Sequence, residues 1–169
     1  MNKLTKIKLR KITKTDLPYF LKWWRNEELI KLTSGINIES EKILKNLFDK
    51  MLVKSSEHFM IVNYEKIIGH ISLARKNQTT FEINIVIGEK KYQGRGLGTM
   101  AIKKAVDIGF HKMGYKKAYL EVRLDNLRAI RTYEKCGFAD SGLKIYKDNK
   151  NQPVVKKMIL NSAENCLMI

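Results

Sequence analysis

The sequence predicts a mixed α/β fold, with a central, mostly antiparallel sheet of about seven strands flanked by about four helices. Segments that alternate apolar and polar residues, as half-buried strands do, are interleaved with segments that place apolar residues at helical spacing. Apolar residues are 44% and charged residues 30% of the 169 residues, which is typical of a globular protein. The length favours a single domain over residues 1–169.

The first half is expected to form a strand, a group of helices and a three-stranded meander. The strand is predicted at 6–12. A cap at Thr15 or Asp16 would begin a helix that runs to about Asn26. The other predicted elements are a short turn at 27–32, an amphipathic helix from Ser40 to the break at Ser55 and Ser56, and strands at 59–64, 67–74 and 80–87.

The second half is expected to begin with a helix and to end with a hairpin. Its predicted elements are a helix at 97–113, a strand at 117–122, a helix at 127–135, and strands at 138–146 and 154–160 joined around residues 148–151. Residues from Asn161 onward are expected to be frayed.

A glycine-rich turn, Gln93-Gly94-Arg95-Gly96-Leu97-Gly98, separates the strand at 80–87 from the helix at 97–113. Unpaired backbone N–H groups and the helix dipole make such a turn a place to hold an anion. The spacing excludes a dinucleotide-binding fingerprint, because Thr99 stands where that motif needs its third glycine. It also excludes a Walker loop, because no lysine follows Gly98. The turn therefore indicates a pyrophosphate cradle, with an ordinary strand-to-helix turn as the alternative.

The same turn resembles the acetyl-CoA pyrophosphate loop of the GNAT superfamily of acetyltransferases. A second family motif is matched by Asn126, Ala129, Tyr133, Lys135, Gly137 and Phe138. The resemblance covers nearly the full chain and looks closest to the branch with ribosomal-protein, spermidine and aminoglycoside acetyltransferases. It implies the GNAT fold, in which the middle strands of the sheet splay apart.

The resemblance also implies that acetyl-CoA is the cosubstrate and that no metal takes part. The turn would hold the pyrophosphate, with a further charge from Arg95, while the edge of the strand at 85–87 would pair with the pantetheine arm. Asn126 would contact the same arm. The expected cofactor-binding residues are Ile85, Val86, Ile87, Gln93, Gly94, Arg95, Gly96, Leu97, Gly98, Thr99, Asn126 and Tyr133.

Acetyl transfer to an amine needs a neutral amine, a stabilised oxyanion and a protonated leaving thiolate. An amine of pKa about 10.4 is neutral in about 0.04% of molecules at pH 7, which corresponds to roughly 4.6 kcal/mol. Glu82 is the candidate base, with acceptor binding or simple solvation as alternatives. A backbone N–H near Val86 would stabilise the oxyanion. By resemblance Tyr133 would protonate the thiolate; the alternative is a core tyrosine.

Strand alternation places Glu82, Asn84 and Val86 on one face of the sheet, where side chains of the neighbouring strand can join them. Trp24 fits the buried stripe of its helix and Trp23 falls beside it, so one of the two would line a pocket. His70 is a pocket residue or a structural one. The expected substrate-binding residues are Trp23, Trp24, Arg25, Asn26, His70, Ser72, Glu82 and Asn84.

The net charge of +16 suits a polycationic acceptor only if carboxylates gather locally. The candidates for such a cluster are Glu27, Glu28, Glu39, Glu41 and Glu82. The leading interpretation is direct transfer, in a ternary complex, to a small-molecule amine such as a polyamine, an amino sugar or an aminoglycoside. The alternative acceptor is the N-terminus of a ribosomal or other protein. A non-catalytic nucleic-acid-binding module is a distant alternative, because no clustered basic face or reading motif is present.

The sequence also predicts where the protein is located in the cell and whether it forms a dimer. Residues 1–14 lack the apolar core of a secretory signal, and no apolar run is long enough to cross a membrane. Cys136 and Cys166 have no metal-ligand spacing, which fits a reducing compartment. We therefore expect a cytoplasmic protein with no membrane or specific nucleic-acid partner. The apolar residues at 166–169 would suit a homodimer contact.

Overall fold

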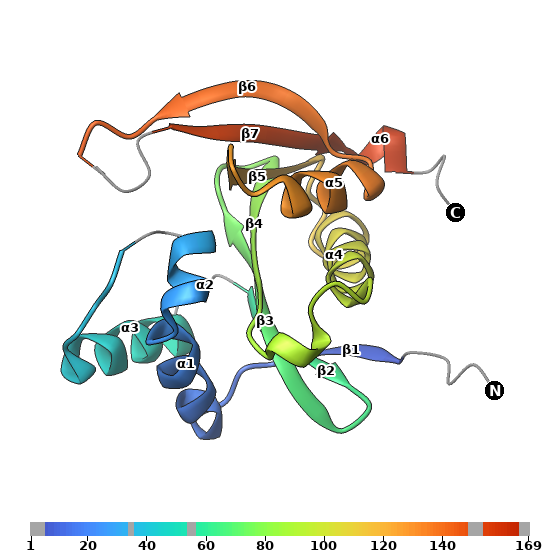
Figure 1. Cartoon of the computed structure of the whole chain (residues 1–169). Coiled ribbons are helices and arrows are strands. Elements are labelled where there is room, and N and C mark those ends of the chain that lie inside the picture. The colour runs from blue at the N-terminus through green and yellow to red at the C-terminus, as the bar shows by residue number, and fades with distance from the viewer. Residues whose placement is uncertain (1–5, 34–35, 54–56, 149–153, 166–169) are drawn as a thin grey trace.

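The computed structural model describes residues 6–33, 36–53, 57–148 and 154–165. Its strands form one seven-stranded sheet in the order β1-β2-β3-β4-β5-β7-β6, as Figure 1 shows. All neighbouring strands are antiparallel except β4 and β5, which are parallel. The strands are β1 (Ile7–Lys11), β2 (Glu57–Asn63), β3 (Lys66–Arg75), β4 (Thr80–Ile87), β5 (Lys117–Arg123), β6 (Ala139–Ile145) and β7 (Val154–Asn161). The predicted sheet is confirmed.

The helices differ from the prediction mainly at their ends. They are α1 (Leu17–Trp24), α2 (Glu27–Leu32), α3 (Glu41–Val53), α4 (Leu97–Asp107), α5 (Leu127–Lys135) and α6 (Ser162–Asn165). The predicted helix that reached Asn26 ends at Trp24, because the Asn26 side chain accepts a hydrogen bond from the N–H of Leu29 and caps α2. The tail expected to fray from Asn161 instead continues β7 and forms α6.

Several predicted boundaries cannot be compared in full, since they lie wholly or partly outside the described residues. These are the break at 55–56 and the hairpin turn at 148–151. The proposed contact at 166–169 also lies outside them.

Two apolar clusters lie on opposite faces of the sheet. One packs α4 and α5 against the strands and includes Ile83 of β4, while the other joins α1, α2 and α3 to the sheet and includes Val86. In Figure 1, α4 and α5 accordingly lie on the other side of the sheet from α1, α2 and α3. The alternation expected along β4 is therefore confirmed.

The centre of the sheet is open where β4 and β5 part. Their parallel pairing covers only residues 80–82 of β4 and 117–119 of β5. Beyond that point, β4 stays paired with β3 as far as Ile87, and β5 stays paired with β7 as far as Arg123. Each strand is thus held by its antiparallel partner, and residues 83–87 of β4 face β5 without pairing to it.

Gly109, in a π-helical turn (Ile108–Lys112) at the end of α4, gives a test of this packing. A Cβ atom at Gly109 would lie 2.3 Å from the ring of Phe81, which is fully buried. We expect Gly109→Ala to lower the free energy of unfolding by about 1–3 kcal/mol in denaturant titration. Gly98→Ala is the control, because a Cβ there makes only a normal contact at 3.9 Å; equal losses in the two variants would contradict the prediction.

Candidate functional site

The glycine-rich turn joins the end of β4 to the start of α4. Gly94 and Gly96 have φ angles of 72° and 74°, and a Cβ atom on either would meet nothing within 4 Å. Glycine is therefore needed there for the left-handed backbone and not for lack of space. Gly96 precedes α4 without a side-chain cap, so the first N–H groups of the helix remain available to an anion.

The Gln93 side chain fixes the turn from within the protein. Its Nε2 donates to the carbonyl oxygen of Ile87 at 2.8 Å, and its Oε1 accepts from the Arg128 guanidinium at 3.3 Å. Gln93 thus ties the end of β4 to the start of α5. Arg128 had no motif to indicate it, yet it lies beside the turn and lines the same cavity.

A cavity of about 1370 Å³ extends from this turn along the gap between β4 and β5 to the space below α1, α2 and α3. It exceeds the roughly 300–1,000 Å³ of a usual small-molecule pocket and has room for two ligands. The predicted site residues that line it are Trp23, Trp24, His70, Ser72, Glu82, Asn84, Ile85, Val86, Ile87, Gln93, Gly94, Gly96, Gly98, Thr99, Asn126 and Tyr133.

Four predicted site residues do not line this cavity. Arg25 forms an ion pair with Glu41 at 2.6 Å, and Asn26 caps α2. Leu97 is buried in the core, which leaves only its backbone for binding. Arg95 is exposed on the outer side of the turn.

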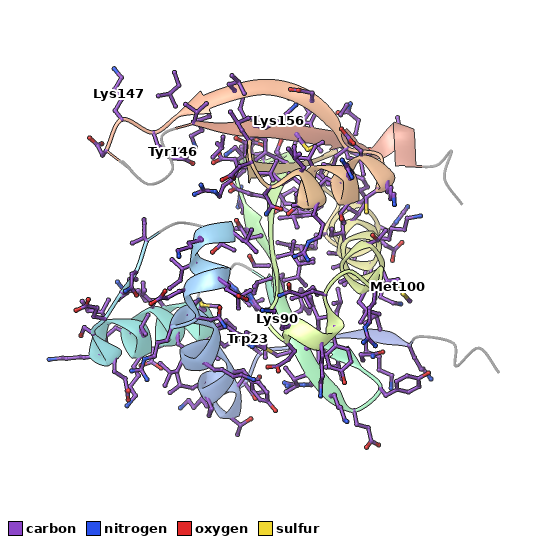
Figure 2. The ribbon with its side chains drawn as sticks, viewed as in Figure 1. Trp23, Lys90, Met100, Tyr146, Lys147 and Lys156 are labelled. Atoms are coloured by element: carbon purple, nitrogen blue, oxygen red, sulfur yellow. The ribbon has the colours of Figure 1, made fainter. Side chains whose placement is uncertain are left out.

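The two tryptophans are arranged differently from the prediction. Trp23 is the buried one, at 3% exposure, and its indole N–H donates to Glu89 at 3.1 Å, whereas Trp24 is only half-buried. The prediction that Trp24 lies on the buried face of this helix was wrong, because the face of α1 that packs inward contains Phe20 and Trp23. A Cβ at Gly88 would lie 2.2 Å from the Trp23 ring, so α1 packs closely on the segment between β4 and the glycine-rich turn. Trp23 and Lys90, the neighbour of Glu89 in that segment, lie close together in Figure 2.

Asn126 connects two helices across the cavity. Its side-chain oxygen accepts from the N–H of Ala129 at 3.2 Å and so caps α5. Its Nδ2 donates to the carbonyl oxygen of Leu32, at the end of α2, at 3.3 Å. The amide therefore lies where a ligand in the gap between β4 and β5 would meet it.

Tyr133, on α5, faces the same gap from the α4 side of the sheet. It is 9% exposed, and burial raises the pKa of its hydroxyl to about 12. Within the described part of the chain, the hydroxyl has no hydrogen-bond partner. Tyr133 is thus protonated at neutral pH and can donate to a group in the cavity.

Glu82 is the last residue of β4 that pairs with β5, where it lies directly opposite Tyr119. Its carboxylate accepts from Lys76 at 3.2 Å, and its side chain is 26% exposed. In the pairing of β3 with β4, Ala74 lies opposite Glu82 and Ser72 lies opposite Asn84. Because alternate residues of a strand share a face, His70 lies on the same face as these residues. The predicted shared face is confirmed.

His70 is buried among rings on this face. Its Nε2 lies 3.1 Å from Nδ1 of His58, and the Phe20 ring centroid is 4.8 Å away. Burial, and then the proximity of His58, lowers the pKa of His70 to about 3. His70 is therefore neutral at physiological pH.

The expected cluster of five carboxylates does not form in the cavity. Glu28 pairs with Lys90 and Glu41 with Arg25 and Lys45, and of the five only Glu82 lines the cavity. The second cavity carboxylate is Glu121 of β5, which sequence reasoning missed. No short sequence pattern pointed to it, because its position in the cavity follows from the register of β5 against β4.

Neither a metal site nor a membrane span is found in the part of the chain that the structure describes. Among those residues, His, Cys, Asp and Glu side chains form no group of three close enough to share a metal ion. The helices there are too short or too polar to cross a bilayer.

Comparison with known proteins identifies relatives over most of the chain. Residues 15–138 match the Acetyltransferase (GNAT) family. A spermidine N(1)-acetyltransferase of Escherichia coli K12 is 32% identical over 139 residues, covering 80% of this chain and 74% of that protein. The corresponding enzyme of Vibrio cholerae is 26% identical over 172 residues, covering 95% and 99%. The crystal structure of V. cholerae spermidine N-acetyltransferase in complex with CoA and spermine has a TM-score of 0.83 at 24% identity, covering 95% and 98%, which shows a shared fold.

The buried His70 predicts a specific pH dependence of stability. Unfolded His70 binds a proton near pH 6.5, while folded His70 stays neutral down to about pH 3. Stability is therefore lost as the pH falls below 6.5, by up to about 1.4 kcal/mol per pH unit. In guanidinium titrations at pH 7.5 and 5.0, His70→Gln should lose less stability on acidification than the wild type.

His111→Gln provides the matched control, because it replaces an exposed histidine by the same residue. If His70→Gln and the wild type lost the same stability between the two pH values, the buried neutral state of His70 would be wrong.

Proposed function

Because the chain belongs to the GNAT family of acetyltransferases, we propose that it transfers the acetyl group of acetyl-CoA to a primary amine of a linear polyamine such as spermidine. The observation that supports this acceptor best is the pair of carboxylates, Glu82 and Glu121, on the cavity wall beside the strand gap. Five basic residues also line the cavity, three of them on α5 (Arg128, Arg131 and Lys135), so the two carboxylates favour a cationic ligand only at their own part of the wall, beside the strand gap.

The residues present fit acetyl-CoA. The left-handed glycines and the free N–H groups at the start of α4 suit its pyrophosphate, and Arg128 would add a charge-assisted hydrogen bond. The unpaired edge of β4 from Ile83 to Ile87 suits the amide groups of the pantetheine arm, in the manner of an added strand. The Asn126 amide, which lines the cavity, would contact the same arm. Bound there, acetyl-CoA supplies the activated acetyl group.

In the proposed mechanism, the chain orients the two substrates and moves two protons. Glu82 accepts a proton from the acceptor ammonium, directly or through water, which offsets part of the roughly 4.6 kcal/mol needed to obtain the neutral amine. A backbone N–H near Val86 donates to the developing oxyanion. The Tyr133 hydroxyl donates its proton to the departing thiolate, and the tyrosinate regains a proton from the acceptor nitrogen, which loses its second proton as the amide forms. His70 and Ser72 shape the wall next to Glu82.

A cytoplasmic location and a homodimer belong to the same proposal. A protein N-terminus remains the alternative acceptor, and it is distinguished by the acceptor panel below.

The first test combines acceptors with a Tyr133 variant. Thiol release from acetyl-CoA should be seen with spermidine and should exceed that with aminoglycosides and short N-terminal peptides. Tyr133→Phe should lower kcat by about 10²–10⁴-fold while acetyl-CoA still binds in calorimetry. Tyr64→Phe, in the β2–β3 turn, is the control and should match the wild type. Wild-type turnover of peptides but not of polyamines would refute the proposed acceptor, and an active Tyr133→Phe would refute the proton donor.

The second test concerns the cofactor side. Arg128→Met removes the guanidinium beside the turn and should raise KM for acetyl-CoA about 3–10-fold, while KM for spermidine changes less than twofold. Arg75→Met, at the exposed end of β3, provides the matched loss of one positive charge. Equal increases in the two Arg variants would indicate a general charge effect and would exclude a local contact.

A further inference from the structure

Glu121 is the most heavily hydrogen-bonded carboxylate of the cavity wall. It accepts from the Tyr119 hydroxyl at 2.6 Å, from Lys144 Nζ at 2.8 Å and from the Tyr146 hydroxyl. Although burial opposes this, the hydrogen bonds from Lys144, Tyr119 and Tyr146 hold the pKa of Glu121 below its ordinary range. Glu121 is therefore a fixed negative charge at 12% side-chain exposure.

The cavity wall contains two groups of the same chemistry. Lys76 Nζ lies 3.2 Å from Glu82 and 4.0 Å from the centroid of the Tyr119 ring. Lys144 Nζ lies 2.8 Å from Glu121 and 4.3 Å from the centroid of the Tyr146 ring. A carboxylate together with an aromatic ring is the combination that binds an alkylammonium group. Each group thus already holds one alkylammonium, supplied by the chain itself.

The lysines approach these carboxylates from outside the cavity. Glu82, Glu121 and Tyr146 line the cavity, whereas Lys76 and Lys144 do not. Tyr146 follows the end of β6, an edge strand, as Figure 2 shows. The Lys144 side chain is 39% exposed, so its ammonium can turn into water when another cation takes its place.

The spacing of the two groups follows from the sheet. Glu82 pairs in register with Tyr119, and Glu121 lies two residues further along β5 on the same face. That displacement is about 6.6 Å along the strand, and the spacing of about 4.8 Å between neighbouring strands brings the separation of the Glu82 and Glu121 Cα atoms to about 8 Å. Two amines separated by three or four methylene groups lie about 5–6 Å apart when extended. Glutamate side chains that lean toward each other across the gap can shorten this separation, so the two carboxylates can each bind one of two adjacent cations of a polyamine.

We propose that Glu121, with Tyr146, binds the second ammonium group of the acceptor while the reacting amine lies at Glu82, and that Lys144 competes for the same carboxylate. This inference rests on the proposed polyamine acetyltransferase activity. Glu121 is then the residue that selects amines with two cations, and Lys144 keeps its carboxylate paired when no acceptor is bound. Exchange of one ammonium for another leaves no buried charge unpaired.

The test compares two acceptors across three variants. Spermidine has the second cation, and 3-butoxypropylamine has the primary amine and similar length without it. Glu121→Gln should lower the ratio of kcat/KM for spermidine to kcat/KM for 3-butoxypropylamine at least tenfold, mainly through KM for spermidine. Lys144→Met should lower KM for spermidine about 2–5-fold. The control is Glu57→Gln, which breaks the ion pair between Glu57 and Lys11; this pair also joins a carboxylate on a strand to a lysine, but neither residue lines the cavity.

The outcomes distinguish an acceptor-binding role of Glu121 from a purely structural one. If Glu121→Gln impairs both acceptors equally, or if Lys144→Met raises KM for spermidine, the cluster is structural and the inference is wrong. An unchanged ratio in Glu121→Gln, with spermidine still acetylated, overturns this inference alone. If the wild type acetylates no polyamine, the proposed function fails, and this inference with it.

Discussion

The early parting of β4 from β5 is the constraint on which the site depends. Three residues of each strand pair, and then each strand follows its antiparallel partner, β3 or β7. Unpaired backbone groups inside a protein are costly, so an open edge in the middle of a sheet needs a partner. In the proposed function, an extended ligand with its own amide groups would provide that partner. The same opening connects the glycine-rich turn, Tyr133 and the carboxylate wall in one cavity.

The overall charge says little about the acceptor, because recognition is local. Most of the basic residues that the structure describes are exposed, and of the five that line the cavity three lie on α5, whereas Glu82 and Glu121 lie beside the strand gap. Lys76 and Lys144 partly neutralise these carboxylates, which limits the cost of holding two negative charges near each other without a ligand. The proposed cation-binding wall would therefore keep its carboxylates paired when no acceptor is bound.

The cofactor side was more predictable from the sequence than the acceptor side. The glycine spacing and the Asn126–Tyr133 motif are local in sequence, so they identified their elements with correct bounds for β4 and α5. The acceptor wall depends on contacts between distant elements. The inward rotation of Trp23 follows from its bond to Glu89, and the position of Glu121 follows from strand register. Neither contact is encoded in a short pattern.

The two sides of the site are also mechanically connected. Glu89, in the segment that leads to the glycine-rich turn, accepts from Lys22 and Trp23 of α1. Lys90 pairs with Glu28 of α2, and Asn126 donates to the end of α2 from the start of α5. The helices that cover the acceptor space are therefore anchored on the segments that would hold the cofactor. A ligand that orders the turn would also order α1 and α2, because they share these contacts. For that reason the acceptor wall and the cofactor cradle form one structural unit.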